Sequence, residues 1–578
     1  MRFAPLALAL ACFLTLFFGL GTVGYLDVRE ARDARVAEEL RSAGEWLTPV
    51  LGHRPLFDKP LPGYLPEILT HDGAHESPVA SRLLRAALAA ALVLLVWRIG
   101  TTHFGRRAGP AAGLVLASSL ALPLAARTDA AQLLGTLAAW IATALFARTL
   151  FGAGAGGQQR PAAAKSPADA APPQRSWISA AAIPGAHLAL AAACLFAGPL
   201  SALWPLGGAA LYARLSGRGT TLRALRPLAA LAVIAGLALP WYGAMTERHG
   251  EAFLSKVLQF PYGANSPGPW YAGVVLSISL LVAGAFPWSA LLPAAFSHAA
   301  MRWLRITRAG RGGNAVDSEA LAREEREERE ERTSHFFIAC LVAAIVPVAF
   351  YPLPPISAVM PALPAVALLC GRFLDHLAED PARLRGVFSR ASLMLGITGT
   401  VAAIAFSAAG QRLTALFPGL RWVAPFALLS GWAPFLVHFF LRRSGLAAAL
   451  IALPVVLGMP LAAWRLMPEL EDFVSARRAA EAMNLASPPL TPLALLEDAP
   501  PTLRLYLERN AVRIDSLGLL SALRGRDGYA YLAYRPALEK ETARRLNAPL
   551  EVLARTPVLV LARTPGPVPR ANPAVPAP

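Results

Sequence analysis

The chain has 578 residues, of which 55% are hydrophobic and only 16% are charged, and its mean hydropathy is +0.46. This composition excludes an ordinary soluble enzyme, whose charged fraction is larger. The net charge of +17 comes largely from arginines in short connections beside apolar runs, where they set membrane orientation and meet anionic headgroups. We therefore expect a polytopic membrane protein that contacts membrane lipids and does not bind nucleic acid.

The first apolar run, residues 4–26, is long enough to cross a bilayer, which takes about 20 residues. A cleaved signal peptide would begin in a similar way, but no clear small-x-small cleavage pattern precedes Asp27. We interpret the run as a retained first helix. Twelve further runs predict thirteen crossings, and they lie at 83–101, 109–126, 130–152, 178–199, 202–214, 226–244, 270–297, 335–352, 355–374, 391–409, 420–441 and 444–465.

The distribution of arginine and lysine predicts the orientation. Positive charges gather in alternate connections, which places the N-terminus in the cytoplasm and the loop 27–82 on the outer side. Two cytoplasmic stretches have the composition of linkers: the Ala/Pro/Gly-rich 153–176 and the charged Gly310 to Thr333, which we expect to be a solvated helix or disordered.

Hydropathy changes after residue 465 to short β-like runs separated by helical segments. We expect a membrane domain over 1–465, a small α/β domain over 466–564 on the outer face, and a disordered Pro-rich tail over 565–578. The expected strands lie in 511–514, 529–534 and 550–561, and the expected helices are 502–509 and 537–546.

The four cysteines all lie inside apolar segments, with no paired spacing and no His cluster. Neither disulfides nor a zinc site is therefore indicated, and the cysteines are expected to pack in the core.

The loop after the first helix carries the most informative polar residues. Asp27 and Glu30 are three residues apart and would share a helix face, where two carboxylates can act as a general base or hold a cation. The same spacing is also typical of a helix N-terminus, where acidic groups cap the positive end of the dipole. Spacing alone leaves both interpretations open.

A set of short motifs runs through the chain in a consistent order. In the first outer loop these are Glu30, Arg32, Ala34, Ala37, Glu39, Leu40, Gly44-Glu45-Trp46, Pro49, Phe57-Asp58-Lys59-Pro60 and Tyr64. Further along are Ser81-Arg82-Leu83, His103-Phe104-Gly105-Arg106-Arg107, Arg127-Thr128-Asp129, Leu239-Pro240-Trp241, Trp270-Tyr271, Phe286-Pro287-Trp288 and Pro361-Ala362-Leu363-Pro364. In these motifs the chain resembles the GT-C glycosyltransferases of the aminoarabinose-transferase and protein O-mannosyltransferase group, and the resemblance covers most of its length.

The resemblance implies an all-α membrane fold with an outer C-terminal domain, and an inverting transfer of sugar from a polyprenyl-phosphate donor. The acceptor would be an envelope lipid, glycan or protein at the periplasmic face of a bacterial inner membrane. The catalytic carboxylates implied are Glu30, Asp27 and Asp129. The residues implied to bind the donor phosphate are Lys59, with Arg32 and Arg82 as helpers. No cofactor is certain, although Asp58 could supply one ligand to a divalent cation.

The chain departs from the family pattern at several of these positions. Arg29 stands where the family has the first acid of its pair, and we hypothesise that Glu30 with Asp27 takes over that role. The family's lysine before a Gly-Pro is Ala197 here, and its Lys-Leu-Pro reads Pro354-Pro355-Ile356. Two alternatives stay open: a non-catalytic envelope scaffold, and a lipid transporter, which would show intramembrane ionisable residues and internal repeats.

Overall fold

The computed structural model describes residues 4–564 with several gaps. The undescribed positions within this span are 27–28, 53, 71–77, 153–176, 218, 260–269, 298–317, 351–354, 489, 497–499, 509, 515–519, 521, 524–526 and 547–549. Asp27, the predicted linker 153–176 and the predicted tail 565–578 therefore lie outside the described residues.

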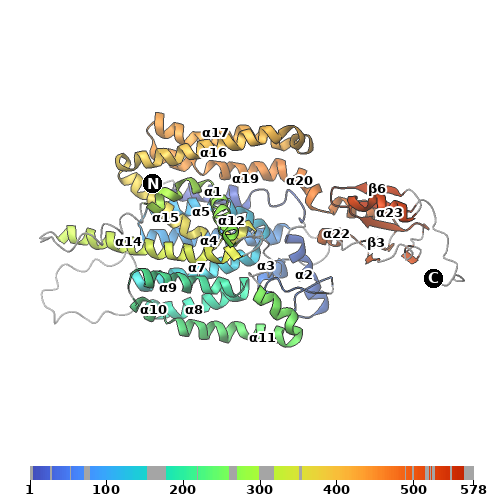
Figure 1. The fold of residues 1–578 in the computed structure, drawn as a ribbon, viewed down its shortest axis with the longest axis horizontal. Coiled ribbons are helices and arrows are strands. Elements are labelled where there is room, and N and C mark those ends of the chain that lie inside the picture. Colours follow the sequence, from blue (N-terminus) through green and yellow to red (C-terminus); the bar gives the residue numbers. More distant parts are fainter. Residues whose placement is uncertain are drawn as a thin grey trace.

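Helices occupy the apolar runs along the chain. Among the described residues, seven helices are long and apolar enough to cross a membrane, and two bent helix pairs raise the number to nine. The fold is a polytopic helical membrane protein with a small C-terminal sheet domain (Figure 1). The count of thirteen crossings stays a prediction. The helices are α1 Ala4–Cys12, η1 Phe13–Phe17, α2 Glu30–Ala43, α3 Leu65–Thr70, α4 Val79–His103, α5 Ala108–Ala117, α6 Ala121–Thr128, α7 Ala130–Phe151, α8 Trp177–Ala197, α9 Pro199–Leu215, α10 Thr220–Leu225, α11 Pro227–Gln259, α12 Trp270–Gly284, α14 Ser318–Ile345, α15 Leu363–Glu379, α16 Pro381–Leu416, α17 Val423–Phe440, α18 Ser444–Leu450, α19 Leu453–Leu461 and α20 Met467–Val474.

The first crossing differs from the single helix expected over 4–26. Helical structure ends at Phe17, and the chain continues in an extended or turn conformation. The buried Arg82 and the half-buried Arg127 bind the carbonyl groups that the broken helix leaves without partners. Arg127 donates to two carbonyls at the helix end, and Arg82 donates to three in the segment 20–24.

Two other expected crossings are bent. The run 109–126 forms α5 and α6, which meet at 56°, and the run 270–297 turns by 110° after Gly284. Alanine fills much of the buried surface between the helices, and such small side chains let membrane helices approach closely.

The charged stretch before residue 333 is helical from Ser318 onward and exposed over 324–327, as expected for a solvated helix. From Ser318 it is continuous with the apolar helix that follows, because α14 runs without a break to Ile345. The start of α14 projects from the end of the bundle opposite to α2 and the C-terminal domain (Figure 1).

The C-terminal domain is built on a five-stranded mixed sheet in the order β4-β3-β5-β7-β6. The expected run 550–561 is two antiparallel strands joined by a short turn, and one strand, β3, was not predicted. One face of the sheet packs against α21 and the other buries a second apolar cluster. The elements are β3 Leu493–Leu495, β4 Ala511–Arg513, β5 Tyr531–Tyr534, β6 Glu551–Arg555, β7 Val560–Arg563, α21 Arg477–Ala486, α22 Pro501–Tyr506 and α23 Glu539–Leu546.

The helix α2 lies between the bundle and the C-terminal domain (Figure 1). Its buried Ala31 and Ala34 pack with Leu505 of α22. Next to them the backbone N–H of Tyr25 donates to the Tyr506 hydroxyl at 2.7 Å. The α2 helix is therefore held from two sides, which fixes the direction of the charged side chains along it.

Candidate active site

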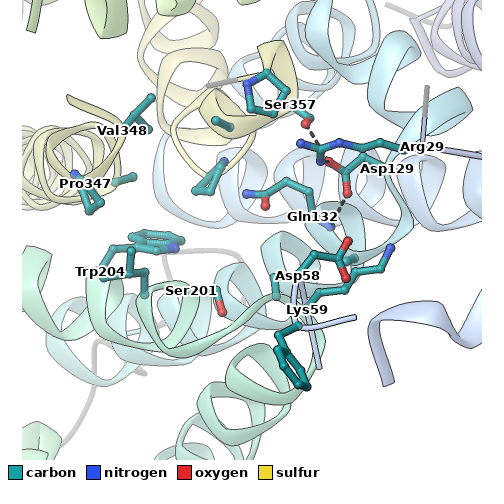
Figure 2. A pocket seen from close by; sticks show the side chains of 18 of the residues that line it. Arg29, Asp58, Lys59, Asp129, Gln132, Ser201, Trp204, Pro347, Val348 and Ser357 are labelled. Atoms are coloured by element: carbon teal, nitrogen blue, oxygen red, sulfur yellow. Dashed lines mark hydrogen bonds and ion pairs between the residues drawn. The ribbon is translucent and has the colours of Figure 1, made fainter. Parts of the chain in front are cut away.

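A cavity of about 460 Å³ opens where α2, the following loop, α7, α9, α11 and the segment 355–361 meet. Charged side chains line one part of it and apolar side chains line the rest (Figure 2). The charged residues are Arg29, Arg32, Asp58, Lys59, Asp129 and Lys256, and the apolar ones include Leu200, Trp204, Ala344, Pro347, Val348 and Pro361. The site thus combines an ionic end with an apolar wall.

The loop that carries Lys59 is fixed on both sides. The Phe57 ring packs against Phe253 of α11, with ring centroids 5.4 Å apart. On the other side Gly63 lies so close to α8 that a β-carbon there would be 2.6 Å from the Phe196 carbonyl oxygen. Glycine at residue 63 therefore allows the loop to lie against the bundle, and Lys59 is directed into the cavity.

Lys59 is paired with a carboxylate that the sequence did not single out. Its ammonium lies 2.5 Å from Asp33 of α2 and 4.2 Å from the centre of the Tyr64 ring. Burial raises the pKa of Asp33, whereas the positive charges of Lys59 and Arg32 act to lower it. Asp33 is fully buried behind the cavity wall, so Lys59 both neutralises it and presents its ammonium to the cavity.

Arg32 and Asp58 form a second ion pair at the cavity wall. Arg32 Nη2 lies 2.5 Å from one oxygen of Asp58, and the Tyr64 hydroxyl donates to the other oxygen. Burial and the negative charge of Asp58 raise the pKa of Tyr64 well above its ordinary value, so this hydroxyl stays a donor. The side chains of Arg32 and Asp58 are each about a quarter exposed, and both face the cavity.

Asp129 forms the third ionic pair, with Arg29 (Figure 2). Asp129 precedes α7 and accepts the backbone N–H of Gln132 at 3.2 Å, which makes it the N-cap of that helix. Its other oxygen accepts the hydroxyl of Ser357 at 2.7 Å. Arg29, at the position of the family's first acid, therefore binds the carboxylate that the resemblance implies is catalytic.

Glu30 does not line this cavity. It is 1% exposed and is bound by Arg82 at 2.6 Å and by Arg85 at 2.5 Å. Arg85 also binds the buried Glu67 at 2.7 Å. Burial raises the pKa of Glu67 to about 7, against the opposing effect of Arg85.

Glu30 and Arg82, implied by the resemblance to act on the acceptor and the donor phosphate, therefore do not meet Lys59 in this cavity, which corrects their placement. Both side chains point instead into a closed cluster of two carboxylates and two guanidinium groups, and neither is among the cavity-lining residues. The physical reason is that α2 begins at Glu30, so the adjacent positions 29 and 30 face different directions. Of the predicted site residues, Arg32, Asp58, Lys59 and Asp129 do meet in the cavity.

The cavity carries a surplus of positive charge. Four cations line it, namely Arg29, Arg32, Lys59 and Lys256. Three carboxylates pair with them, Asp58 and Asp129 in the lining and Asp33 behind it, which leaves a net charge of 4 − 3 = +1. An anion that enters the cavity therefore meets a favourable field.

A metal at Asp58 finds little support in this geometry. Both oxygens of Asp58 are bound by protein groups. In the part of the chain that the structure describes, no group of three or more His, Cys, Asp or Glu side chains is arranged to hold a metal ion.

Several cavity residues were missed by sequence reasoning. Lys256, Ser357, Gln132 and Trp204 come from four different elements, and no local pattern marks them. Arg29 does carry a signal, because it stands at the family's acidic position.

Searches with protein-family models and against curated proteins found no match to the chain. Solved structures do match. ArnT from Cupriavidus metallidurans in the apo state aligns with a TM-score of 0.70 and 16% identity, over 97% of this chain and 98% of that one. The chain has the ArnT fold. The ArnT structure bound to undecaprenyl phosphate aligns with the same TM-score at 17% identity, again over 97% and 98% of the two chains. The fold expected from the motifs is thereby confirmed.

Proposed function

We propose that this protein is a membrane glycosyltransferase that takes its sugar from a polyprenyl-phosphate donor. The observation that carries the proposal is the cavity itself, in which a net charge of +1 and four cationic side chains adjoin an apolar wall. A polyprenyl-phosphate sugar is an anion joined to a long hydrocarbon chain, and it needs both surfaces at once. The likeness to ArnT bound to undecaprenyl phosphate supports this ligand class.

In this proposal the donor phosphate lies between Lys59 and Arg32. The Lys59 ammonium gives a point contact, and the Arg32 guanidinium can bind two oxygens. The carboxylate partners Asp33 and Asp58 hold both cations in place before the donor arrives. The prenyl chain follows the apolar residues that include Leu200 and Val348.

The chemistry proposed is an inverting displacement. An acceptor oxygen attacks the anomeric carbon, the bond from that carbon to the phosphate oxygen breaks, and polyprenyl phosphate leaves with both bonding electrons. Asp129 takes the acceptor proton as the general base. The cations stabilise the charge that develops on the leaving phosphate. Glu30 does not contact the substrates in this proposal. It is a positioning residue, because its ion pairs with Arg82 and Arg85 fix the start of α2.

The donor's own charge explains how Asp129 becomes available. Arg29 is bound to Asp129. A bound phosphate competes for the Arg29 guanidinium, whose side chain is 35% exposed, and so frees a lone pair on the oxygen of Asp129 that Arg29 shares with Ser357. Ser357 and the backbone N–H of Gln132 keep Asp129 in place during this exchange.

The proposal includes the side of the membrane. The N-terminus is cytoplasmic and the cavity opens to the periplasm of a bacterial inner membrane, which follows from the distribution of positive charge. The domain over 466–564 lies on the same side and contacts the acceptor, which is an envelope lipid, glycan or protein.

The test is a transfer assay with the purified full-length chain and a polyprenyl-phosphate sugar. We expect release of polyprenyl phosphate, and we expect Asp129→Asn to lower its rate by about 100-fold or more. Asparagine keeps an acceptor for Ser357, so the melting temperature should change little. Movement of intact donor lipid across a bilayer without release would instead show a transporter, and neither activity would show a non-catalytic scaffold. Intact-mass comparison of envelope lipids with and without the protein would then identify the acceptor class.

A further inference from the structure

A fourth cation, Lys256, reaches the cavity from the far side. It lies on α11 and also lines a small adjoining hollow of about 40 Å³, together with Lys59 and Ala197. Lys256 is exposed, so packing does not explain its position. It lies in the last turns of α11, after an apolar stretch that is long enough to cross the membrane.

The local backbone explains how Lys256 comes to face the ionic end. Gly250 has φ 55° and ψ −134°, a conformation that interrupts the helix and is open to glycine at little cost. The segment after this break carries Phe253, which packs against Phe57 of the loop that bears Lys59. The contact therefore ties the position of Lys256 to that of Lys59.

Lys256 differs from the other three cavity cations in its charge balance. Arg29, Arg32 and Lys59 are each bound to a carboxylate. No carboxylate among the described residues is seen within ion-pair distance of Lys256. Lys59 and Asp58 line the same hollow, but each is already paired, with Asp33 and Arg32 respectively, and Ala197 ends α8 there with only a methyl group. The surplus charge on this side of the cavity is therefore that of Lys256.

We infer that Lys256 is a second phosphate-binding residue, and that it holds the departing polyprenyl phosphate more tightly than the donor. This inference rests on the proposed function. The donor phosphate is a diester with one negative charge, whereas the released monoester carries up to two near neutral pH. An uncompensated ammonium gains about twice as much Coulomb energy from the second species as from the first. Lys256 is thus a positioning residue for the leaving group and contributes to retention of the product.

The experiment compares Lys256→Met with Lys540→Met in the purified full-length protein. Lys540 is an exposed helical lysine of the C-terminal domain and serves as the matched control. Equilibrium binding of undecaprenyl phosphate and of a polyprenyl-phosphate sugar is measured for each variant, with anionic phospholipid vesicles as a third ligand. We expect Lys256→Met to weaken undecaprenyl phosphate binding about tenfold and donor binding about threefold. Lys256→Arg should restore most of both, and Lys540→Met should change neither.

Each outcome separates this inference from the proposed function. If the unaltered protein binds neither prenyl ligand, both proposals fail. If it binds both and Lys256→Met binds them equally well, the proposed function stands and Lys256 is not a phosphate ligand. Weaker binding to anionic vesicles alone would show that Lys256 contacts only bulk lipid headgroups, which also overturns the inference.

Discussion

Two groups of charges lie on either side of the start of α2, and they are built in opposite ways. The buried group consists of Glu30, Glu67, Arg82 and Arg85, whose side chains are all 4% exposed or less. It contains equal numbers of acids and bases. The cavity group contains four cations and, with Asp33 behind Lys59, three carboxylates, and its Arg29 and Arg32 side chains are 35% and 26% exposed. The residues 29 and 30 are neighbours in sequence, yet they belong to different groups.

This difference shows which charges are free to act on a ligand. In a dry environment a charge is tolerated only with partners, and every partner of Glu30 is another side chain or backbone group of the protein. In the cavity the carboxylates compensate only part of the positive charge, so an incoming phosphate can supply the rest. We therefore expect substitutions in the buried group to change stability and substitutions in the cavity group to change activity.

The largest effect is expected at Lys59. Lys59→Met alone would leave Asp33 buried without its nearest cation, so we pair it with Asp33→Asn. The double variant should lower the transfer rate by about 100-fold or more, because one preorganised cation at the leaving phosphate is lost. Initial rates of polyprenyl phosphate release measure this effect. Asp33→Asn alone is the control, and its transfer rate should stay within about tenfold of that of the unaltered protein. Equal rates for the single and the double variant would mean that Lys59 takes no part in the mechanism.

The second prediction concerns Glu30, where we expect a loss of stability and little loss of activity. Glu30→Gln removes one negative charge from beside two buried guanidinium groups, which should cost about 3–5 kcal/mol of stability. Thermal unfolding in detergent measures this loss of stability. The protein that remains folded should keep its specific activity within about threefold. A large loss of activity at an unchanged melting temperature would restore Glu30 as a catalytic residue, and Asp27→Asn should be assayed beside it.

The third prediction lies at the boundary between the two groups. Arg29→Gln removes a cavity cation whose side chain is partly exposed and releases Asp129. Donor KM should rise about tenfold, since a charge-assisted hydrogen bond to phosphate is lost. The value of kcat should change by less than about threefold, because Ser357 still positions Asp129. A fall in kcat with unchanged KM would mean that Arg29 acts on the transition state and does not bind the donor.

The sequence predicted the elements that depend on hydropathy. The expected apolar runs fall largely on helical structure, with the run 4–26 helical only to Phe17. The resemblance identified Lys59, Arg32, Asp58 and Asp129 as site residues that the fold does bring together. Their roles stay predictions. These residues could be found because they lie in one short loop and at one helix start.

The remaining features depend on contacts between distant segments. Glu30 meets arginines 52 and 55 residues away, and nothing in its local spacing distinguishes a buried partner of arginine from a catalytic base. Ser357 reaches Asp129 across 228 residues. The helix break after Phe17 depends on Arg127, which no apolar run indicates. Strand β3 is only three residues long, too short for its pattern to show.

The smallest expected effect is a pH dependence of stability from Glu67. Its pKa is raised by burial from the ordinary 4.5 to about 7, so the folded state binds a proton more readily than the unfolded chain does. The stability that this provides is complete below about pH 4.5 and is lost as pH rises through 7, and it amounts to about 3 kcal/mol at most. Glu67→Gln mimics the protonated form and keeps an oxygen for Arg85, so its melting temperature should fall less than that of the unaltered protein between pH 5 and 8. Parallel curves would mean that Glu67 stays ionised over this range, and the buried group would then be electrically neutral throughout.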